Sequence, residues 1–427
     1  MTLALDHPRC QRHRDLWLEE LLSHAVHTVP RYHGAGVDLG AYPLVEKEDI
    51  IADQGSFISD KVSHLKPALL EALAKPQNFN NHWVGGGAAW RNDILIEGTT
   101  GTTGVPFRFP RTRQERSRIA LGVWRQRKVI DPLASSRHFY PFFHRADGLA
   151  HPVDPFDATP ENVDRLYRSL AASGIRWLHS FPGLILSHLR MLSDEALRGH
   201  PLRYVELSGV FPSSEVVAGI RQRLGAEMVN QFGCMEVLAV GYGRNASSFD
   251  VLAENVYVEI VDDCGQAIDA PGIPGRLAVT ARHQRLFPFI RYLTGDLAWW
   301  CEGGIGRQFV LVNRSRDSED PKWGSYRSGA HYFRVMLPKA FAISGLMPFR
   351  FLQIREEGES RFEVLTDRVA NSDVFVRALG EVCRADPLTS DIVLSHLILD
   401  ERALAAELQK KPRLFIPRSA IAARCPA

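Results

Sequence analysis

The stretch TTGTTGVP, residues 99–106, is the part of the sequence that decides the fold assignment. It lies between two short apolar runs, DILIE (residues 93–97) and FRF (residues 107–109), which predict β-strands. Gly101 and Gly104 permit positive φ and a close approach of the backbone to a ligand. The threonine hydroxyls and successive backbone N–H groups can surround an anion. No Lys-Ser/Thr pair follows the last glycine, so this is not a Walker A loop, and a plain turn is the alternative.

Outward from this loop, the sequence alternates between helical and strand patterns. Residues 1 to about 90 and 112–129 have apolar residues at helical spacing. Beyond them, the helical segments 161–173 and 183–192 alternate with the short apolar strands WLHSF and RYVELSG. This β-then-α rhythm predicts an α/β fold, with mixed, mostly parallel sheets flanked by helices.

The texture changes near residue 251, where strand patterns such as NVYVEIVD, GRLAVT and FVLVN follow one another. Residues 314–327 are charged and poor in large aliphatic side chains, which is typical of a linker or hinge. A small α+β pattern of about 100 residues follows. The sequence therefore predicts a large domain over residues 1–315 and a small C-terminal domain over residues 316–427.

The composition is that of an ordinary globular protein. The chain has 427 residues, and 51 Lys+Arg against 49 Asp+Glu leave a formal charge of +2. This balance gives no reason to expect a nucleic acid or a membrane as partner. Six scattered cysteines and no apolar leader favour a reducing cytoplasm. No CxxC pair is present, so no structural zinc is expected.

Two further segments carry candidate chemistry. In VNQFGCMEV (residues 229–237), Phe232 can stack on a flat base, and Glu236 can hold a hard cation such as Mg²⁺. The alternative for Glu236 is a solvated side chain at the end of a buried strand. In FIRYLTGDL (residues 289–297), Asp296 can accept both hydroxyls of a ribose. Its alternative is an aspartate in a tight turn after a strand.

Together these segments resemble the acyl-adenylating (AMP-binding) superfamily, and within it phenylacetate-CoA ligase and its capsule-biosynthesis-type relatives. TTGTTGVP resembles that family's [ST][ST]G[ST]TGxP loop. NQFGCME is similar to its NxYGxTE segment, and FPFIRYLTGDL to its PxIRYxTGDL segment. LSGVFPSSEVV resembles its LxGExLxxEVR stretch.

The resemblance implies that residues 316–427 form a mobile lid, and it also implies a set of site residues. The phosphates of ATP would meet Thr99, Thr100, Gly101, Thr102, Thr103 and Gly104. The rest of the nucleotide would meet Ser208, Gly209, Asn230, Phe232, Gly233, Asp296 and Arg314. Ser208 and Gly209 would line the adenine, Phe232 would stack on it, and Glu236 would ligate Mg²⁺. Arg314 would join Asp296 at the ribose, although the family's preceding glycine is Asn313 here.

One departure from the family pattern concerns the C-terminal lysine, which normally reaches the α-phosphate. The nearest match to its motif is IPRSAIAAR (residues 416–424), in which Ala422 and Ala423 replace the Gly-Lys pair. Lys410 and Lys411 are candidates to substitute for it; the alternative is a solvated helix end. The loss of a transition-state cation costs on the order of 10²- to 10³-fold in rate.

The acyl pocket is expected between the aromatic-rich middle segment and the FGCME strand. Its candidates are Phe139, Tyr140, Phe143, Phe181 and Cys234, which suit an aromatic acid; ordinary core packing is the alternative.

The resemblance thus implies ATP-dependent activation of a carboxylic acid, with an aromatic acid as the leading candidate, to give an acyl-adenylate, followed by transfer to a thiol such as coenzyme A. The acceptor alternatives are an amine and a carrier protein, and a catalytically weakened relative that only binds nucleotide or acyl-adenylate is the third reading. Either a monomer or a homodimer fits the sequence.

Overall fold

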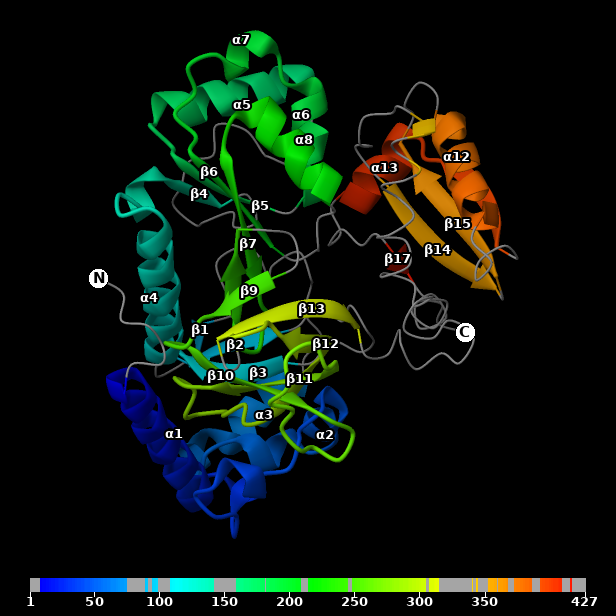
Figure 1. Ribbon diagram of the computed structural model, residues 1–427. Helices are drawn as coiled ribbons and strands as arrows, with labels where there is room; N and C mark the ends of the chain where they lie inside the picture. Colours follow the sequence, from blue (N-terminus) through cyan, green and yellow to red (C-terminus); the bar gives the residue numbers. More distant parts are fainter. Residues whose placement is uncertain are drawn as a thin grey trace. The chain divides into compact units, whose positions relative to one another are not determined.

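The computed structural model describes residues 8–74, 89–90, 94–98, 108–141, 159–180, 182–208, 214–244, 248–304, 307–314, 340, 343–344, 352–358, 360–367, 372–385, 392–408 and 415–416 (Figure 1). The chain divides into two compact units. The first comprises residues 1–135, 231–243 and 247–312, and the second comprises residues 136–230, 244–246 and 313–427. Each unit is described by itself.

Four helices belong to the first unit: α1 (Pro8–Thr28), α2 (Lys47–Ala52), α3 (Lys66–Ala74) and α4 (Arg113–Ile130). The start of α4 is fixed by a capping box, in which the Thr112 hydroxyl accepts from the Glu115 N–H and the Glu115 carboxylate accepts from the Thr112 N–H. The Glu115 carboxylate also accepts from the backbone N–H groups of Arg285 and Leu286. One buried carboxylate therefore ties the helix start to a distant loop.

The strands of the first unit pair mainly antiparallel. A small sheet has the order β1 (Ala89–Trp90), β2 (Ile94–Gly98), β3 (Arg108–Thr112), and both of its pairs are antiparallel. The larger set has the order β10 (Val256–Val261), β11 (Gly275–Ala281), β12 (Tyr292–Trp300), β13 (Gln308–Arg314), β9 (Ser248–Val251), β8 (Gly241–Gly243). The pairs β10–β11, β11–β12, β13–β9 and β8–β9 are each antiparallel.

An aromatic cluster fills the interior of the first unit. Phe57, Phe109, Phe287 and Phe289 are each at most 1% exposed. Phe109 meets Phe289 edge-on at a centroid distance of 5.2 Å, and Phe57 stacks on Phe287 at 5.7 Å. Because each ring removes a large apolar surface from water, this cluster holds β3 against the loop between β11 and β12.

The second unit contains the parallel strands. Its strand order is β7 (Glu227–Phe232), β6 (Tyr204–Ser208), β5 (Trp177–Ser180), β4 (Phe139–Pro141), and the β4–β5 and β5–β6 pairs are parallel. The helices α5 (Pro160–Ala172), α6 (Pro182–Met191), α7 (Asp194–Leu197) and α8 (Ser214–Leu224) lie beside these strands (Figure 1). The apolar faces of these helices and strands form one core cluster.

The C-terminal part of the second unit has a sheet and a core of its own. The sheet order is β16 (Val393–Ile398), β15 (Arg361–Thr366), β14 (Leu352–Gly358), β17 (Phe415–Ile416). Helix α12 (Ser372–Ala385) packs Phe375, Leu379 and Cys383 against this sheet, and each of these side chains is fully buried. Helix α13 (Glu401–Leu408) contributes Leu404 to a small adjoining cluster.

The predicted α/β class, with a large mixed sheet flanked by helices, is confirmed. Strands β4, β5 and β6 pair in parallel. The pairs β8–β9 and β10–β11 are antiparallel. The predicted division at residues 315/316 and the mobility of the C-terminal domain stay predictions, and residues 315–327 of the predicted hinge lie outside the described residues. No helix in the described part of the chain is long and apolar enough to cross a membrane.

Candidate functional site

Glu236 lies in the turn that follows β7 in the first unit, and it is 6% exposed. The turn folds back tightly, because the Val240 N–H donates to the Phe232 carbonyl at 2.8 Å. A Cβ at Gly233 would lie 1.9 Å from the Leu238 carbonyl oxygen, so only glycine fits at this close approach. The glycine of the FGCME segment is therefore required by the turn that presents Glu236.

Three side chains hold Glu236 in place. The Tyr292 hydroxyl donates to Glu236 Oε1 at 2.7 Å. The Glu236 carbonyl accepts from Arg111 Nη2 at 2.5 Å and from Gln284 Nε2 at 2.6 Å. The backbone and the carboxylate are thus both fixed by buried donors. Sequence reasoning did not assign Tyr292, Arg111 or Gln284, and the one signal for Tyr292 was its position inside the IRYLTGDL segment.

Arg111 also links this turn to the hairpin that carries the predicted phosphate loop. It is 1% exposed and forms an ion pair with Glu97, which is also paired with Arg116. Glu97 lies in β2 and Arg111 in β3, the two strands on either side of residues 99–107. The base of the threonine loop and the Glu236 turn are therefore held by one buried guanidinium.

The TGD segment is a bulge within a strand rather than a turn after one. Leu293 and Leu297 of β12 pair with Ala278 and Arg276 of β11, so three residues of β12 stand opposite one residue of β11. Gly295 has a φ of 77° at this point, and Asp296 is half-buried. Bulges re-aim side chains and are common beside active sites. The alternative of a tight turn for Asp296 is therefore corrected to a β-bulge.

The Cys234 thiol senses the negative charges of two predicted site residues, Glu236 and Asp296. Burial raises the pKa of the Cys234 thiol well above its usual value, and the negative charges of Glu236 and, to a lesser extent, Asp296 raise it further. An electrostatic effect of this kind falls off with distance. The Cys234 thiol therefore lies within electrostatic range of the carboxylates of Glu236 and Asp296, two of the other predicted site residues.

The ring of Phe232 is half-buried and packs against two other rings of the first unit. Its centroid lies 5.7 Å from that of Phe249 and 5.8 Å from that of Phe309. This packing fixes the ring plane, as a stacking platform for a base requires. Asn230 lies two residues earlier in β7 and is 4% exposed.

Arg291 is a conspicuous cation of the IRYLTGDL segment, and its contacts are structural. Its guanidinium pairs with Glu259 at 3.2 Å and donates to the carbonyls of Tyr42 and Gly265 at 3.0 and 2.6 Å. It is 5% exposed and has a φ of 49°. Arg291 therefore joins strands and loops of the first unit, one residue before Tyr292.

In the second unit, the predicted residue Ser208 lies at the carboxyl end of β6. Its hydroxyl is 2.9 Å from His179 Nε2, at the same end of the parallel strand β5. Glu206 is fully buried, accepts from Trp177 Nε1 at 2.8 Å, and lies 3.8 Å from His179 Nε2. Ligands of open α/β sheets bind at the carboxyl ends of parallel strands. This polar network was not predicted from the sequence.

The predicted acyl-pocket residues of the second unit fall into two groups. Phe139 is half-buried and lies 6.0 Å, centroid to centroid, from the His179 ring. Tyr140 is 7% exposed and belongs to the core cluster.

Several predicted site residues lie outside the described residues: Thr99, Thr100, Gly101, Thr102, Thr103, Gly104, Phe143, Phe181, Gly209, Lys410 and Lys411. Arg314 ends β13.

Within the described residues, no three His, Cys, Asp or Glu side chains gather as a metal cluster. Mg²⁺ does not need one, because it keeps several waters and commonly takes one or two carboxylates plus substrate phosphates. The buried carboxylate of Glu236, oriented by the Tyr292 hydroxyl, is a ligand of that chemistry.

No protein-family model matches the chain, and neither does any curated protein. Solved structures do match. A 2-hydroxyisobutyryl-CoA ligase in complex with 2-HIB-AMP is 15% identical with a TM-score of 0.63, over 98% of this chain and 91% of that one. An acyl acid amido synthetase in complex with 2,4-DB is 12% identical with a TM-score of 0.59, over 97% and 93%. An anthranilate CoA ligase in complex with anthranoyl-AMP is 13% identical with a TM-score of 0.52, over 75% and 66%. The chain therefore has the fold of the acyl-adenylate-forming ligases.

Proposed function

We propose that this protein is a ligase that uses ATP to activate a carboxylic acid as an acyl-adenylate and then passes the acyl group to coenzyme A. One observation carries the proposal. The fold extends over nearly the whole of a ligase that holds an acyl-adenylate, and within it the chain supplies an oriented buried carboxylate at Glu236, with Asp296 close by.

The reaction has two balanced steps. A carboxylate oxygen of the acid attacks the α-phosphorus of ATP, and the bond to the β-phosphate oxygen breaks, which releases pyrophosphate. A thiol then attacks the activated carbonyl, loses its proton, and displaces AMP. Both steps depend mainly on positioning and charge neutralisation.

The residues of the chain divide this work. Glu236, held by Tyr292, would bind Mg²⁺. The bound Mg²⁺ would offset the negative charge of the phosphates. Asp296 would accept the ribose hydroxyls from its bulge, and Phe232 would stack on the adenine. Ser208, with His179, would contribute polar groups from β6 and β5. Lys410 or Lys411 would supply the cation that the Ala422–Ala423 pair lacks.

The nature of the acid and of the acceptor is part of the proposal. The resemblance to phenylacetate-CoA ligase and the aromatic character of residues 138–143 favour an aromatic acid. The match to an amido synthetase over 97% of this chain supports an amine as the second candidate acceptor.

Pyrophosphate exchange tests the first half-reaction without an acceptor. We expect the purified chain, with ATP and Mg²⁺, to exchange labelled pyrophosphate into ATP with at least one acid from a panel of phenylacetate, benzoate, anthranilate and 2-hydroxyisobutyrate. Glu236→Ala and Asp296→Ala should each lower the exchange rate on the order of 10²-fold. Glu254→Ala is the matched control, because Glu254 is an exposed acid that pairs with Arg125.

The second half-reaction is tested with coenzyme A and with a mixture of amino acids as acceptors, with product mass as the readout. Exchange followed by an amide product would select the amine. ATP binding without exchange for any acid would overturn the ligase and favour a nucleotide-binding relative.

A further inference from the structure

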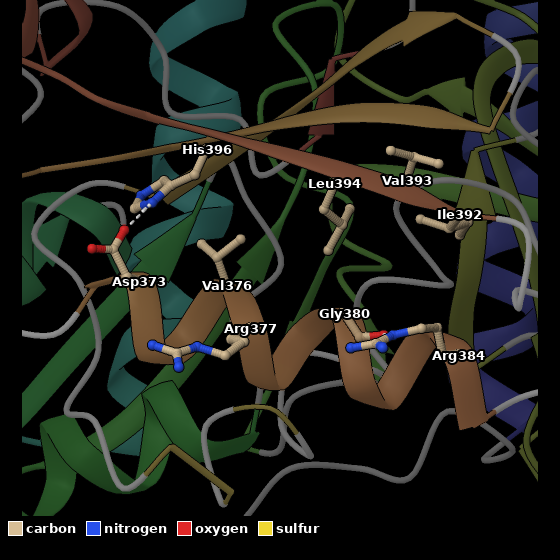
Figure 2. Close-up of a pocket in the computed structure, with 9 residues that line it drawn as sticks. All are labelled: Asp373, Val376, Arg377, Gly380, Arg384, Ile392, Val393, Leu394 and His396. Atoms are coloured by element: carbon tan, nitrogen blue, oxygen red, sulfur yellow. Dashed lines mark hydrogen bonds and ion pairs between the residues drawn. The ribbon is translucent and has the colours of Figure 1, made fainter.

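A groove of the C-terminal sheet lies outside the site described above. It runs between α12 and β16 and has a volume of about 420 Å³ (Figure 2). One wall is the α12 face that carries Asp373, Val376, Arg377, Gly380 and Arg384. These residues follow at spacings of three, one, three and four, so they share one side of the helix. The opposite side of α12 is buried in the core of the sheet.

The other wall of the groove is an edge strand. Among the described residues, β15 is the one strand that pairs with β16. The Val393 N–H donates to the carbonyl of Ser360, just before β15, and the Leu399 N–H donates to the carbonyl of Thr366 in β15, both at 2.8 Å. Successive residues of a strand point their backbone groups in opposite directions. Leu394, His396 and Ile398 therefore direct their N–H and C=O groups to the outer edge.

The side chains along this edge do not protect it. Val393, Leu397 and Ile398 are 59%, 42% and 39% exposed. Natural edge strands are commonly guarded by lysine, proline or a bulge, because a bare edge is a template for another strand. The sequence DIVLSHLILD has neither lysine nor proline. An exposed apolar edge beside a helix is the arrangement in which peptides add to a sheet.

Charge indicates which peptide would fit. Asp373 is held by His396 at one end of the groove, at 2.9 Å between Oδ1 and Nδ1 (Figure 2). The remainder of the helical wall carries two exposed arginines, Arg377 and Arg384. They are seven residues apart, which is about 10 Å along a helix. Side chains on one face of a strand recur about every 6.7 Å, so acids at every second position can reach both arginines.

Gly380, between the two arginines, keeps the groove open. A Cβ at this position would meet nothing within 4 Å, so helix packing does not require a glycine. Glycine in a helix interior is nevertheless less favourable than alanine. The open space lies on the groove side, where a larger side chain would occupy it.

We propose that this groove binds an extended acidic peptide segment of a partner protein, which adds as a strand to the outer edge of β16 and places acidic side chains against Arg377 and Arg384. The apolar residues of the peptide, at the alternate positions, would lie on its opposite face, beside the exposed Val393 and Leu397 of β16. Backbone pairing would supply affinity, and the arginines would select for acids.

Fluorescence anisotropy on the full chain tests the proposal, with the probe fluorescein-Gly-Glu-Val-Glu-Val-Glu-Val-amide. We expect saturable binding that weakens about tenfold for Arg377→Glu and for Arg384→Glu, as removal of a paired charge does. Gly380→Leu should also weaken binding, by filling the groove. Arg402→Glu, the same charge change on the exposed start of α13, is the control and should leave binding within about twofold.

Two further measurements separate strand addition from plain charge attraction. A peptide N-methylated at alternate residues keeps its charges but cannot pair, so its binding should be at least about tenfold weaker. On binding, the amides of Leu394, His396 and Ile398 should gain protection from hydrogen exchange, whereas that of Val393, already bonded to the Ser360 carbonyl, should not.

Four outcomes overturn the proposal. One is no saturable binding of the probe up to about 1 mM. Another is equal binding of the N-methylated peptide, and a third is equal weakening by Arg402→Glu. The fourth is complete displacement by inorganic pyrophosphate with no change in amide protection, which would make the groove a polyanion site. The circular dichroism spectrum of each variant confirms that it is folded.

Discussion

The Tyr292 hydroxyl donates to Glu236 Oε1 at 2.7 Å, and both side chains are buried. The two residues belong to segments 56 positions apart, the turn after β7 and the start of β12. This bond orients a carboxylate that the proposed reaction needs for Mg²⁺, and it has a direct test.

Tyr292→Phe should lower the rate of pyrophosphate exchange about tenfold, because one hydrogen bond to a charged group contributes about 1.5 kcal/mol. The Mg²⁺ concentration needed for half-maximal exchange should rise at the same time. Tyr42→Phe removes a different buried hydroxyl, which donates to the Leu22 carbonyl at 2.9 Å, and serves as the control. An unchanged Mg²⁺ requirement in Tyr292→Phe would contradict the orienting role.

Arg111 should be essential for folding. Its guanidinium pairs with Glu97 and donates to two carbonyls of the Glu236 turn. Arg111→Met leaves the buried Glu97 carboxylate with Arg116 alone, so we expect a loss of about 3–5 kcal/mol in the free energy of unfolding, measured by urea titration. Arg113→Met, at the exposed first residue of α4, is the control and should lower the free energy of unfolding by less than about 0.5 kcal/mol.

The double variant Arg111→Met/Glu97→Gln supplies the second half of this test. Removing both charges should recover part of the lost stability, because no buried carboxylate is left short of a partner. A double variant no more stable than Arg111→Met would place the cost in the two carbonyl bonds instead.

Within the segment IRYLTGDL, we expect Arg291 to be needed for stability and Asp296 to be needed for activity. Arg291→Met should lower the free energy of unfolding by about 3 kcal/mol, because Glu259 would lose its buried partner. Burial raises the pKa of Glu259, and Arg291 opposes that shift, so Arg291→Met should raise it further. Asp296→Ala should lower the exchange rate on the order of 10²-fold yet keep the free energy of unfolding within about 1 kcal/mol of the wild type. Equal stability losses in both variants would refute this division.

His283 should make the stability depend on pH. Burial lowers its pKa to about 4, and the nearby charges of Arg282, Arg118 and Arg285 contribute. The unfolded chain binds a proton below about pH 6.5, whereas the folded chain does so only near pH 4. The contribution of neutral His283 to the free energy of unfolding is therefore fully present above pH 6.5, and it is lost as the pH falls from 6.5 to 4.

The size of this effect is on the order of 1–2 kcal/mol once the partial exposure of the ring is allowed for. Urea titrations of the wild type and of His283→Asn between pH 4 and pH 7 measure it. The variant should have the flatter profile over this range. His33→Asn, at an exposed histidine, is the control and should follow the wild type.

The sequence by itself determined the local elements and the residue types of the candidate site. Alternating apolar residues predicted β10 and β11, and helical spacing predicted α5 and α6, because side-chain periodicity follows directly from backbone geometry. The acids Glu236 and Asp296 could be named because their segments resemble a known pattern.

Only the tertiary structure decided how these residues are held. The bond from Tyr292 to Glu236, the anchoring of the Glu236 turn by Arg111, and the bulge that carries Asp296 join segments far apart in the chain, and no local pattern encodes such pairings. Local sequence fixes backbone preferences within a few residues, whereas a buried polar contact depends on which strands become neighbours and in which register. The structural role of Arg291 and the open edge of β16 became visible for the same reason.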